Sequence, residues 1–143
     1  CLESVLNSSA ERIEIIAIND GSPDNSGEIL DKFAQNNKEL TVIHQKNRGG
    51  APTINRGLAL AKGKYVMILD NDDWLYPGAI DQLIFEGMTH DADIVAGKVL
   101  KVFNNKTEDV FDTTYIVRNE TVTLKTMPSM LNDGFYLGNL WMC

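Results

Sequence analysis

Three carboxylates follow directly on an apolar segment in the middle of the chain. Asp70, Asp72 and Asp73 lie within four residues after the apolar segment 65–69. Two such charges about 5 Å apart repel each other by roughly 3 kcal/mol at an effective dielectric of about 20, so a fold that gathers them needs a cation or hydrogen-bond donors. Oxygen ligands suit Mg²⁺ or Mn²⁺, and Mg²⁺ completes its shell with water and substrate phosphates. The spacing therefore predicts a divalent metal and a phosphorylated substrate.

Short apolar segments alternate with helical patterns before and after these acids. Four segments are apolar, short and bounded by polar turn residues, as buried parallel strands are: residues 13–18, 40–44, 65–69 and 93–96. Between and after them, apolar side chains recur at helical spacing in residues 24–37, 51–61 and 77–88. This alternation predicts an α/β fold with a parallel sheet and right-handed crossovers.

Polar residues stand where the first three predicted strands end. Asp20 follows the first strand, Asn47 the second, and Asp70 with its neighbours the third. Ligands of open parallel sheets bind beyond the carboxyl ends of the strands. The three loops are therefore predicted to converge on one edge of the sheet and form a binding site there.

Size, charge and apolar patterning exclude several classes of protein. The 143 residues are 43% hydrophobic, enough for the core of one domain. The net charge is −7 and basic residues do not cluster with aromatic ones, which argues against nucleic acid as a partner. The longest apolar runs fall far short of a membrane span, so we expect no membrane segment. The two cysteines do not indicate a disulfide framework, which fits a location in the cytoplasm, at the inner face of a membrane included. Cys1 and Cys143 lack the spacing of a zinc site.

The two ends of the sequence lead us to expect part of a longer protein. The chain opens inside a helical pattern at residues 2–6 and stops within the apolar stretch 140–143. After residue 98 the pattern loosens. A hairpin of residues 99–103 and 110–117, and a short helix within 124–131, are the predictions for that part.

Six segments in chain order resemble landmarks of the inverting glycosyltransferases of family 2, which have the GT-A fold. They are residues 1–6, 15–22, 27–30, 47–50, 55–57 and 69–74. The resemblance covers the chain from residue 1 to about residue 97. It implies a Rossmann-like GT-A parallel-sheet core that lacks the family's first strand and its C-terminal part. It also implies that residues 1–97 are the nucleotide-sugar (donor) half and that residues 98–143 begin the acceptor-side half.

The resemblance assigns roles to three of the acids. Asp70 and Asp72 match the family's D-x-D motif, whose carboxylates hold Mn²⁺ or Mg²⁺ on the donor diphosphate and contact the ribose. Asp20 matches an acid that accepts a hydrogen bond from the imide N–H of uracil. The alternative for Asp20 is an Asx-turn that only holds the loop 19–22. Asn19 departs from the family, which has a second acid at that position.

Three further residues are candidates for the nucleotide pocket. Asn47 and Gly50 match a loop that approaches the nucleotide, where glycine permits close backbone contact; an ordinary loop before a helix is the alternative. The family commonly has arginine at the position of Ile54, whereas this chain has Arg56. Arg56 either substitutes in a base or phosphate contact or is a solvated helix residue.

Other conspicuous side chains are interpreted as structural. His44 is a polar neighbour rather than a metal ligand, because no second histidine lies at metal-ligand spacing. Trp74, Tyr76 and Phe85 are predicted to pack under the loop. An inverting transferase needs a general base for the acceptor hydroxyl, and the resemblance places it after Cys143. No catalytic residue is therefore assigned in this chain, which we expect to be inactive alone.

The function that the resemblance implies is metal-dependent transfer of a sugar from a nucleoside diphosphate donor, a UDP-sugar, with inversion. The acceptor would be a hydroxyl of a glycan, polyol or lipid-linked molecule, in cell-wall or polysaccharide biosynthesis. Two alternatives stay open: a module that binds nucleotide sugar without catalysis, and a sugar nucleotidyltransferase. The latter is disfavoured because residues 20–23 lack the basic residue of a phosphate loop.

Overall fold

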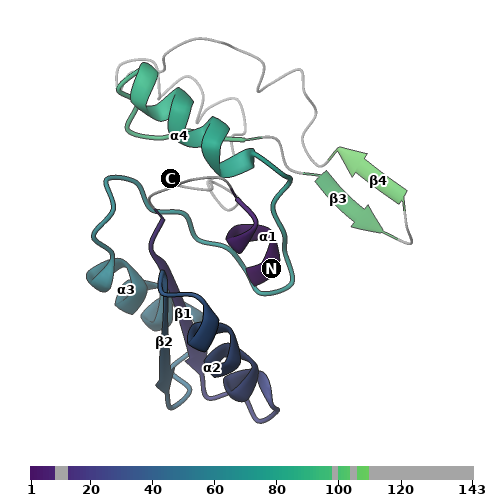
Figure 1. Cartoon of the computed structure of the whole chain (residues 1–143). Helices are drawn as coiled ribbons and strands as arrows, with labels where there is room; N and C mark the ends of the chain where they lie inside the picture. The colour runs from purple at the N-terminus through teal and green to yellow at the C-terminus, as the bar shows by residue number, and fades with distance from the viewer. Residues whose placement is uncertain (9–12, 98–99, 104–105, 110–143) are drawn as a thin grey trace. The chain divides into compact units, whose positions relative to one another are not determined.

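The computed structural model describes residues 1–8, 13–97, 100–103 and 106–109. The helices and strands of these residues, in chain order, are α1 (Leu2–Leu6), β1 (Ile15–Asp20), α2 (Ser26–Asn36), β2 (Leu40–Gln45), α3 (Gly50–Leu60), α4 (Ala79–Thr89), β3 (Leu100–Phe103) and β4 (Lys106–Asp109) (Figure 1). The chain divides into two compact units, residues 9–68 and residues 1–8 with 69–143.

The unit 9–68 is built on a pair of parallel strands. β1 and β2 are in a register that sets Ile15 opposite Leu40 and Asp20 opposite Gln45. α2 contacts both strands and α3 contacts β1, and the strand pair runs between the two helices (Figure 1). Leu40, with 6% of its surface exposed, is the buried hydrophobic residue of the described chain. The predicted β–α–β–α order is confirmed for this unit.

Side chains along the two strands alternate between the α2 side and the α3 side. Successive residues of a strand point to opposite faces, so Asn19 and its register partner His44 share one face, and Asp20 and Gln45 share the other. His44 contacts Asp31 of α2, while Gln45 reaches α3. The last two residues of each strand therefore belong to two separate polar networks, one on the α2 side and one on the α3 side.

Local hydrogen bonds fix the ends of α2 where the sequence predicts them. The Ser26 N–H donates to Asp24 Oδ1 at 3.0 Å. The pKa of Asp24 is lowered below its ordinary value, most by the hydrogen bond that its carboxylate accepts from the Ser26 hydroxyl and next by this N–H. At the other end, Asn37 Nδ2 donates to the Phe33 carbonyl at 2.7 Å. These side chains satisfy backbone groups that a helix terminus leaves without an intrahelical partner.

Two of the four predicted parallel strands are not formed. Residues 65–69 and 93–96 pair with no strand among the described residues, so that part of the prediction is wrong. An apolar, β-branched segment indicates that its side chains are suited to burial. To form a strand it also needs a neighbouring strand that pairs with its N–H and C=O groups. Among the described strands, β1 pairs with β2 and β3 pairs with β4, so none is a partner for either segment.

In the other unit, the segment after the acidic residues is tied to α1. The Leu75 N–H donates to the Ser4 hydroxyl at 3.0 Å, and α4 begins after Gly78, whose φ is 77°. β3 and β4 form an antiparallel hairpin with Phe103 opposite Lys106. A hairpin is thus confirmed with Leu100–Phe103 as its first strand and Lys106–Asp109 as its second. The predicted second strand, 110–117, lies outside the described residues. The predicted helix within 124–131 lies outside the described residues.

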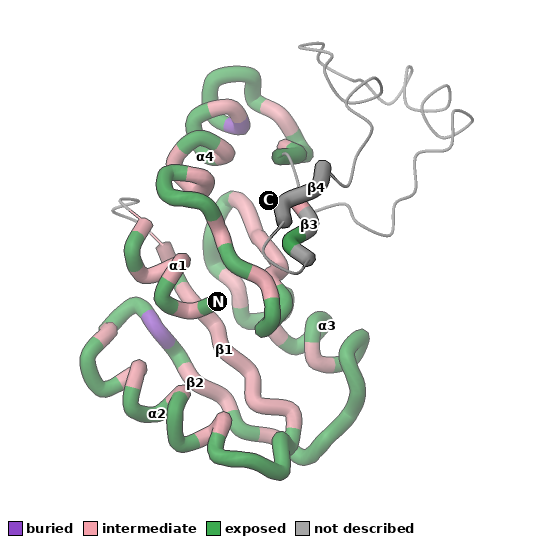
Figure 2. Tube along the Cα trace, turned by 90° about the vertical axis from the view of Figure 1, so that its right-hand side faces the viewer, coloured by how far each residue is buried: buried purple, intermediate pink, exposed green. Residues whose placement is uncertain are grey.

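Several large apolar side chains are exposed rather than packed. Trp74, Tyr76 and Phe85 keep 55%, 60% and 64% of their surface exposed, so the prediction that they pack under the loop is wrong. Much of α4 belongs to the exposed class (Figure 2). An apolar stripe is buried only if another element covers it. Among the described helices, none is long and apolar enough to cross a membrane.

Candidate functional site

The carboxylate of Asp20 binds the loop that follows β2. Asp20 Oδ1 accepts the Gln45 side-chain amide at 2.8 Å and the Arg48 N–H at 2.9 Å, and Oδ2 accepts the Gly49 N–H at 2.9 Å. Gly49 has a φ of 83°, a conformation that glycine adopts without steric cost. The end of β1 and the loop before α3 are therefore joined by one side chain.

Gln45 connects this carboxylate to α3. Its amide nitrogen also donates to Thr53 Oγ1 at 2.9 Å, and its amide oxygen accepts Arg56 Nη1 at 2.6 Å. Thr53 in turn donates to the Gly49 carbonyl at 2.9 Å. Arg56 is thus held two hydrogen bonds away from Asp20. Within the described residues its other guanidinium donors have no partner, which leaves them for an anion.

Hydrogen bonds lower the pKa of Asp20. The bond from Gln45 has the largest effect, partial burial opposes it, and the N–H groups of Arg48 and Gly49 add to the lowering. A carboxylate offers about four acceptor sites, of which three are used here. The Thr53 hydroxyl also lowers this pKa. Oδ2 accepts one of the three bonds while Oδ1 accepts two, so Oδ2 is the oxygen with an acceptor site left for an N–H donor of a ligand.

This lowered pKa predicts a pH-dependent contribution to stability. The unfolded carboxyl titrates near its ordinary value of 3.8, so the contribution is complete above that pH and is lost as the pH falls through the lower folded value. We expect Asp20→Asn to be less stable than wild type in urea unfolding at about pH 7 and the gap to be smaller at about pH 3. An equal gap at both pH values would contradict the assignment.

The Asx-turn that the sequence offered as an alternative for Asp20 is made by its neighbour. The Ser22 N–H donates to Asn19 Oδ1 at 2.9 Å. Gly21, with a φ of +73°, lies so close to the second loop that a Cβ there would be 2.7 Å from the Asn47 nitrogen. A Cβ at Gly50 would meet nothing within 4 Å. The close approach between the loops therefore involves Gly21 rather than Gly50, and within the loop 47–50 the positive φ is at Gly49.

Asp70 and Asp72 belong to the other unit and stand on a tight turn. The Asp73 N–H donates to the Asp70 carbonyl at 3.1 Å, and both Asp70 and Asp72 are exposed. Within the described ranges, no hydrogen bond or ion pair engages either carboxylate, and no group of three or more potential metal ligands is formed. Two solvent-facing carboxylates match the one or two that Mg²⁺ takes when phosphates supply further oxygens.

The match to a protein-family model shows which family this chain belongs to. The model described as Glycosyl transferase family 2 matches residues 1–140, nearly the whole chain. The chain belongs to glycosyl transferase family 2. Its parallel strand pair with flanking helices agrees with a partial Rossmann-like GT-A core.

Several bacterial proteins are similar to this family 2 chain. Glycosyltransferase GlyG of Streptococcus pneumoniae is 43% identical over 98 residues, which cover 68% of this chain and 33% of that protein. Putative glycosyltransferase EpsH of Bacillus subtilis is 39% identical over 84 residues, covering 59% and 24%. Chondroitin synthase of Pasteurella multocida is 36% identical over 86 residues, covering 60% and 9%. The chain spans about a third of the length of the first relative and less of the others.

The structure of the family 2 chain brings together some of the predicted site residues. Asp20 and Arg56 share one network through Gln45, and Asn47 lies against Gly21 beside it. Sequence reasoning missed Gln45 and Thr53. Gln45 could have been found, because it follows directly on the second predicted strand, 40–44, just as Asp20 comes soon after the first, 13–18.

Proposed function

We propose that this protein transfers a sugar from a nucleoside diphosphate donor, a UDP-sugar, to a hydroxyl acceptor with inversion and with the help of a divalent metal. The observation that carries the proposal is the pair of exposed carboxylates, Asp70 and Asp72, on the turn that follows an apolar segment. Family membership favours transfer over the synthesis of sugar nucleotides. The similarity to chondroitin synthase supports a glycan product.

Asp70 and Asp72 would hold Mn²⁺ or Mg²⁺. When bound, such an ion offsets the negative charge that builds on the departing diphosphate. The donor set fits it, because both ligands are carboxylates and neither is engaged by another described side chain. Asp70 would also contact the ribose of the donor.

The network in the unit 9–68 would bind the nucleoside part of the donor. Asp20 would use its remaining acceptor site for the imide N–H of uracil, a donor that cytosine lacks at the same ring position. Arg56 has guanidinium donors beyond the one given to Gln45 and would bind a phosphate oxygen. Asn47 and Gly50 would line the pocket, with the open space around Gly50 leaving room for the ligand.

Ligand-induced thermal stabilisation of the full-length protein tests this proposal. A panel of UDP-, GDP- and CDP-sugars, each with Mn²⁺ and with a chelator, should raise the melting temperature with UDP-sugars and Mn²⁺ together, because a ligand that binds only the native state stabilises it. Equal stabilisation by every nucleotide would contradict the proposed donor class. Stabilisation that persists in the presence of the chelator would contradict the proposed metal requirement. Binding without transfer to any acceptor would favour a non-catalytic nucleotide-sugar module.

A further inference from the structure

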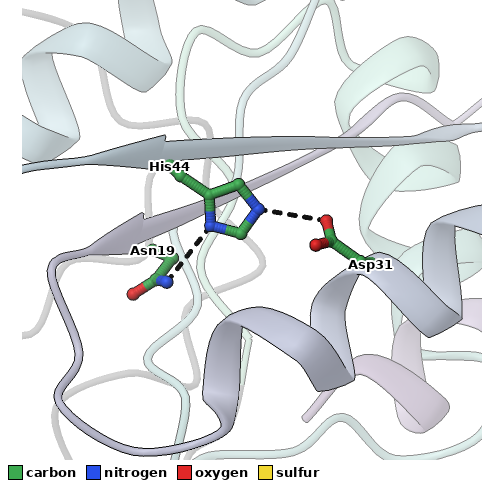
Figure 3. A network of polar contacts seen from close by, with 3 residues as sticks. All are labelled: Asn19, Asp31 and His44. Atoms are coloured by element: carbon green, nitrogen blue, oxygen red, sulfur yellow. Dashed lines mark hydrogen bonds and ion pairs between the residues drawn. The ribbon is translucent and has the colours of Figure 1, made fainter.

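His44 is the centre of a hydrogen-bonded chain on the α2 side of the strands. Its Nδ1 lies 3.2 Å from Asn19 Nδ2, and its Nε2 lies 3.0 Å from Asp31 Oδ1. The imidazole stands between the two partners (Figure 3). Both ring nitrogens are therefore used, and the ring bridges the ends of β1 and β2 to α2.

The backbone decides which ring nitrogen carries the proton. The Ser22 N–H can only donate, so the Asn19 atom 2.9 Å from it is the amide oxygen. The amide nitrogen of Asn19 then faces His44, and an amide nitrogen can only donate. His44 Nδ1 must accept this bond. The imidazole is consequently neutral, with its proton on Nε2 and donated to Asp31.

Close packing against α2 keeps this arrangement in place. A Cβ at Gly27 would lie 2.8 Å from Asn19 Nδ2 and 3.3 Å from His44 Cε1. The backbone of α2 thus covers the amide and the imidazole directly. A side chain at position 27 would therefore push the Asn19 amide and the His44 ring out of this arrangement.

The same amide supports the loop beside Asp20. Asn19 Oδ1 closes the turn 19–22 through the Ser22 N–H, and Gly21 of this turn lies against the backbone of Asn47. Asp20, the next residue of β1, holds the Arg48 and Gly49 N–H groups. A movement of the Asn19 side chain should therefore displace both loops of the proposed donor site, the turn 19–22 and the loop that follows β2.

We propose that Asn19 and His44 are positioning residues of the donor site, and that the neutral Nε2–H form of His44 keeps the turn 19–22 in its binding conformation. An imidazolium carries N–H groups on both nitrogens, and its Nδ1–H would face the NH₂ group of Asn19. The amide would have to turn, and the Ser22 N–H would lose its acceptor. The inference rests on the proposed function, since it assumes that a nucleoside diphosphate binds at these loops.

The charges around His44 act in opposite directions. From α2, the Asp31 carboxylate favours an imidazolium, with Glu28 one turn earlier and Lys32 next to Asp31 in sequence. From β1, Asn19 disfavours it, while the Asp20 carboxylate is engaged on the α3 side. A second proton on the imidazole should therefore break the chain at Asn19 rather than at Asp31.

Two variants separate this role from simple packing. His44→Gln keeps an acceptor for Asn19 and a donor for Asp31 but does not titrate. Asn19→Asp keeps an acceptor for the Ser22 N–H but presents a second carboxylate to the ring. A hydrogen bond between that carboxylate and the ring requires a proton on His44 Nδ1. Both substitutions should reduce the loss of binding on acidification, and Asn19→Asp should reduce it further than His44→Gln.

The first measurement is UDP affinity, with Mn²⁺, of the full-length wild type and both variants at about pH 8 and about pH 6. Wild type should lose about fivefold more affinity on acidification than His44→Gln, the effect of one lost hydrogen bond. Asn19→Asp should lose less than either. Parallel losses in all three proteins would overturn the proposal, because metal and phosphate titrations are common to them.

The second measurement is the tautomer itself, from the ¹⁵N chemical shifts of labelled histidine in wild type. We expect His44 to be protonated on Nε2 alone at alkaline pH, and the exchange protection of the Ser22 amide to fall as His44 gains its second proton. His90, which pairs with Glu86 at 3.4 Å, is the internal control. A proton on Nδ1, or Ser22 protection that does not follow His44, would overturn the proposal even if UDP binds to none of the proteins.

Discussion

Asp72→Ala in the full-length protein should abolish the metal dependence of UDP binding and lower the rate of sugar transfer by about 10³-fold. A metal that offsets leaving-group charge supplies several kcal/mol of transition-state stabilisation, and about 4 kcal/mol corresponds to this factor. The rate is measured as UDP release from the UDP-sugar that stabilises the protein best. Asp72 is exposed, so the loss should occur without loss of folding.

Asn71→Ala is the matched control for this prediction. Asn71 is also exposed, stands between the two carboxylates and has no role in the proposed site. We expect its transfer rate and its Mn²⁺-dependent UDP binding to stay within about twofold of wild type, as for surface substitutions in general. If Asp72→Ala retains both properties as well, the D-x-D assignment is wrong. If both variants lose them, the turn rather than the carboxylate is what matters.

Local patterns in the sequence predicted the elements that local physics determines. α2 and α3 follow from apolar spacing and helix-end residues, and β1 and β2 follow from short apolar runs. The same patterns failed for residues 65–69, because whether an apolar run becomes a strand depends on a neighbour that lies elsewhere in the chain. Burial of Trp74 and Phe85 was mispredicted for a related reason. An apolar side chain is buried only if another element packs on it, and the side chain itself does not indicate which element that is.

The sequence predicted where the candidate site lies in the fold, but not which side chains form hydrogen bonds with one another there. Strand ends located Asp20 and Asn47, because polar residues directly after apolar strands mark the binding edge of such sheets. The bonds of Asp20 to Gln45 and of Gln45 to Arg56 depend on the β1–β2 register and on how α3 lies. The contact between His44 and Asp31 likewise joins a strand to a helix face across 13 residues. No spacing rule contains that information.

Gly21→Ala should destabilise the unit 9–68 and weaken UDP binding together. The positive φ of Gly21 costs an L-residue about 1–2 kcal/mol, and the added Cβ would stand 2.7 Å from the Asn47 nitrogen, so backbone has to move. We expect a loss of about 2–4 kcal/mol in all, since overpacking alone typically costs 1–3 kcal/mol. Hydrogen exchange of the β1 and β2 amides measures the stability of this unit by itself.

Gly50→Ala provides the opposite expectation from the same substitution. A Cβ at Gly50 would meet nothing within 4 Å, and the residue begins α3 with an ordinary φ. Alanine should leave the β1 and β2 amides equally or better protected, because it reduces the entropy of the unfolded chain by up to about 1 kcal/mol. Equal protection in the two variants would contradict the contact between Gly21 and Asn47. Loss of UDP binding in Gly50→Ala with protection intact would instead place the ligand in the open space beside that residue.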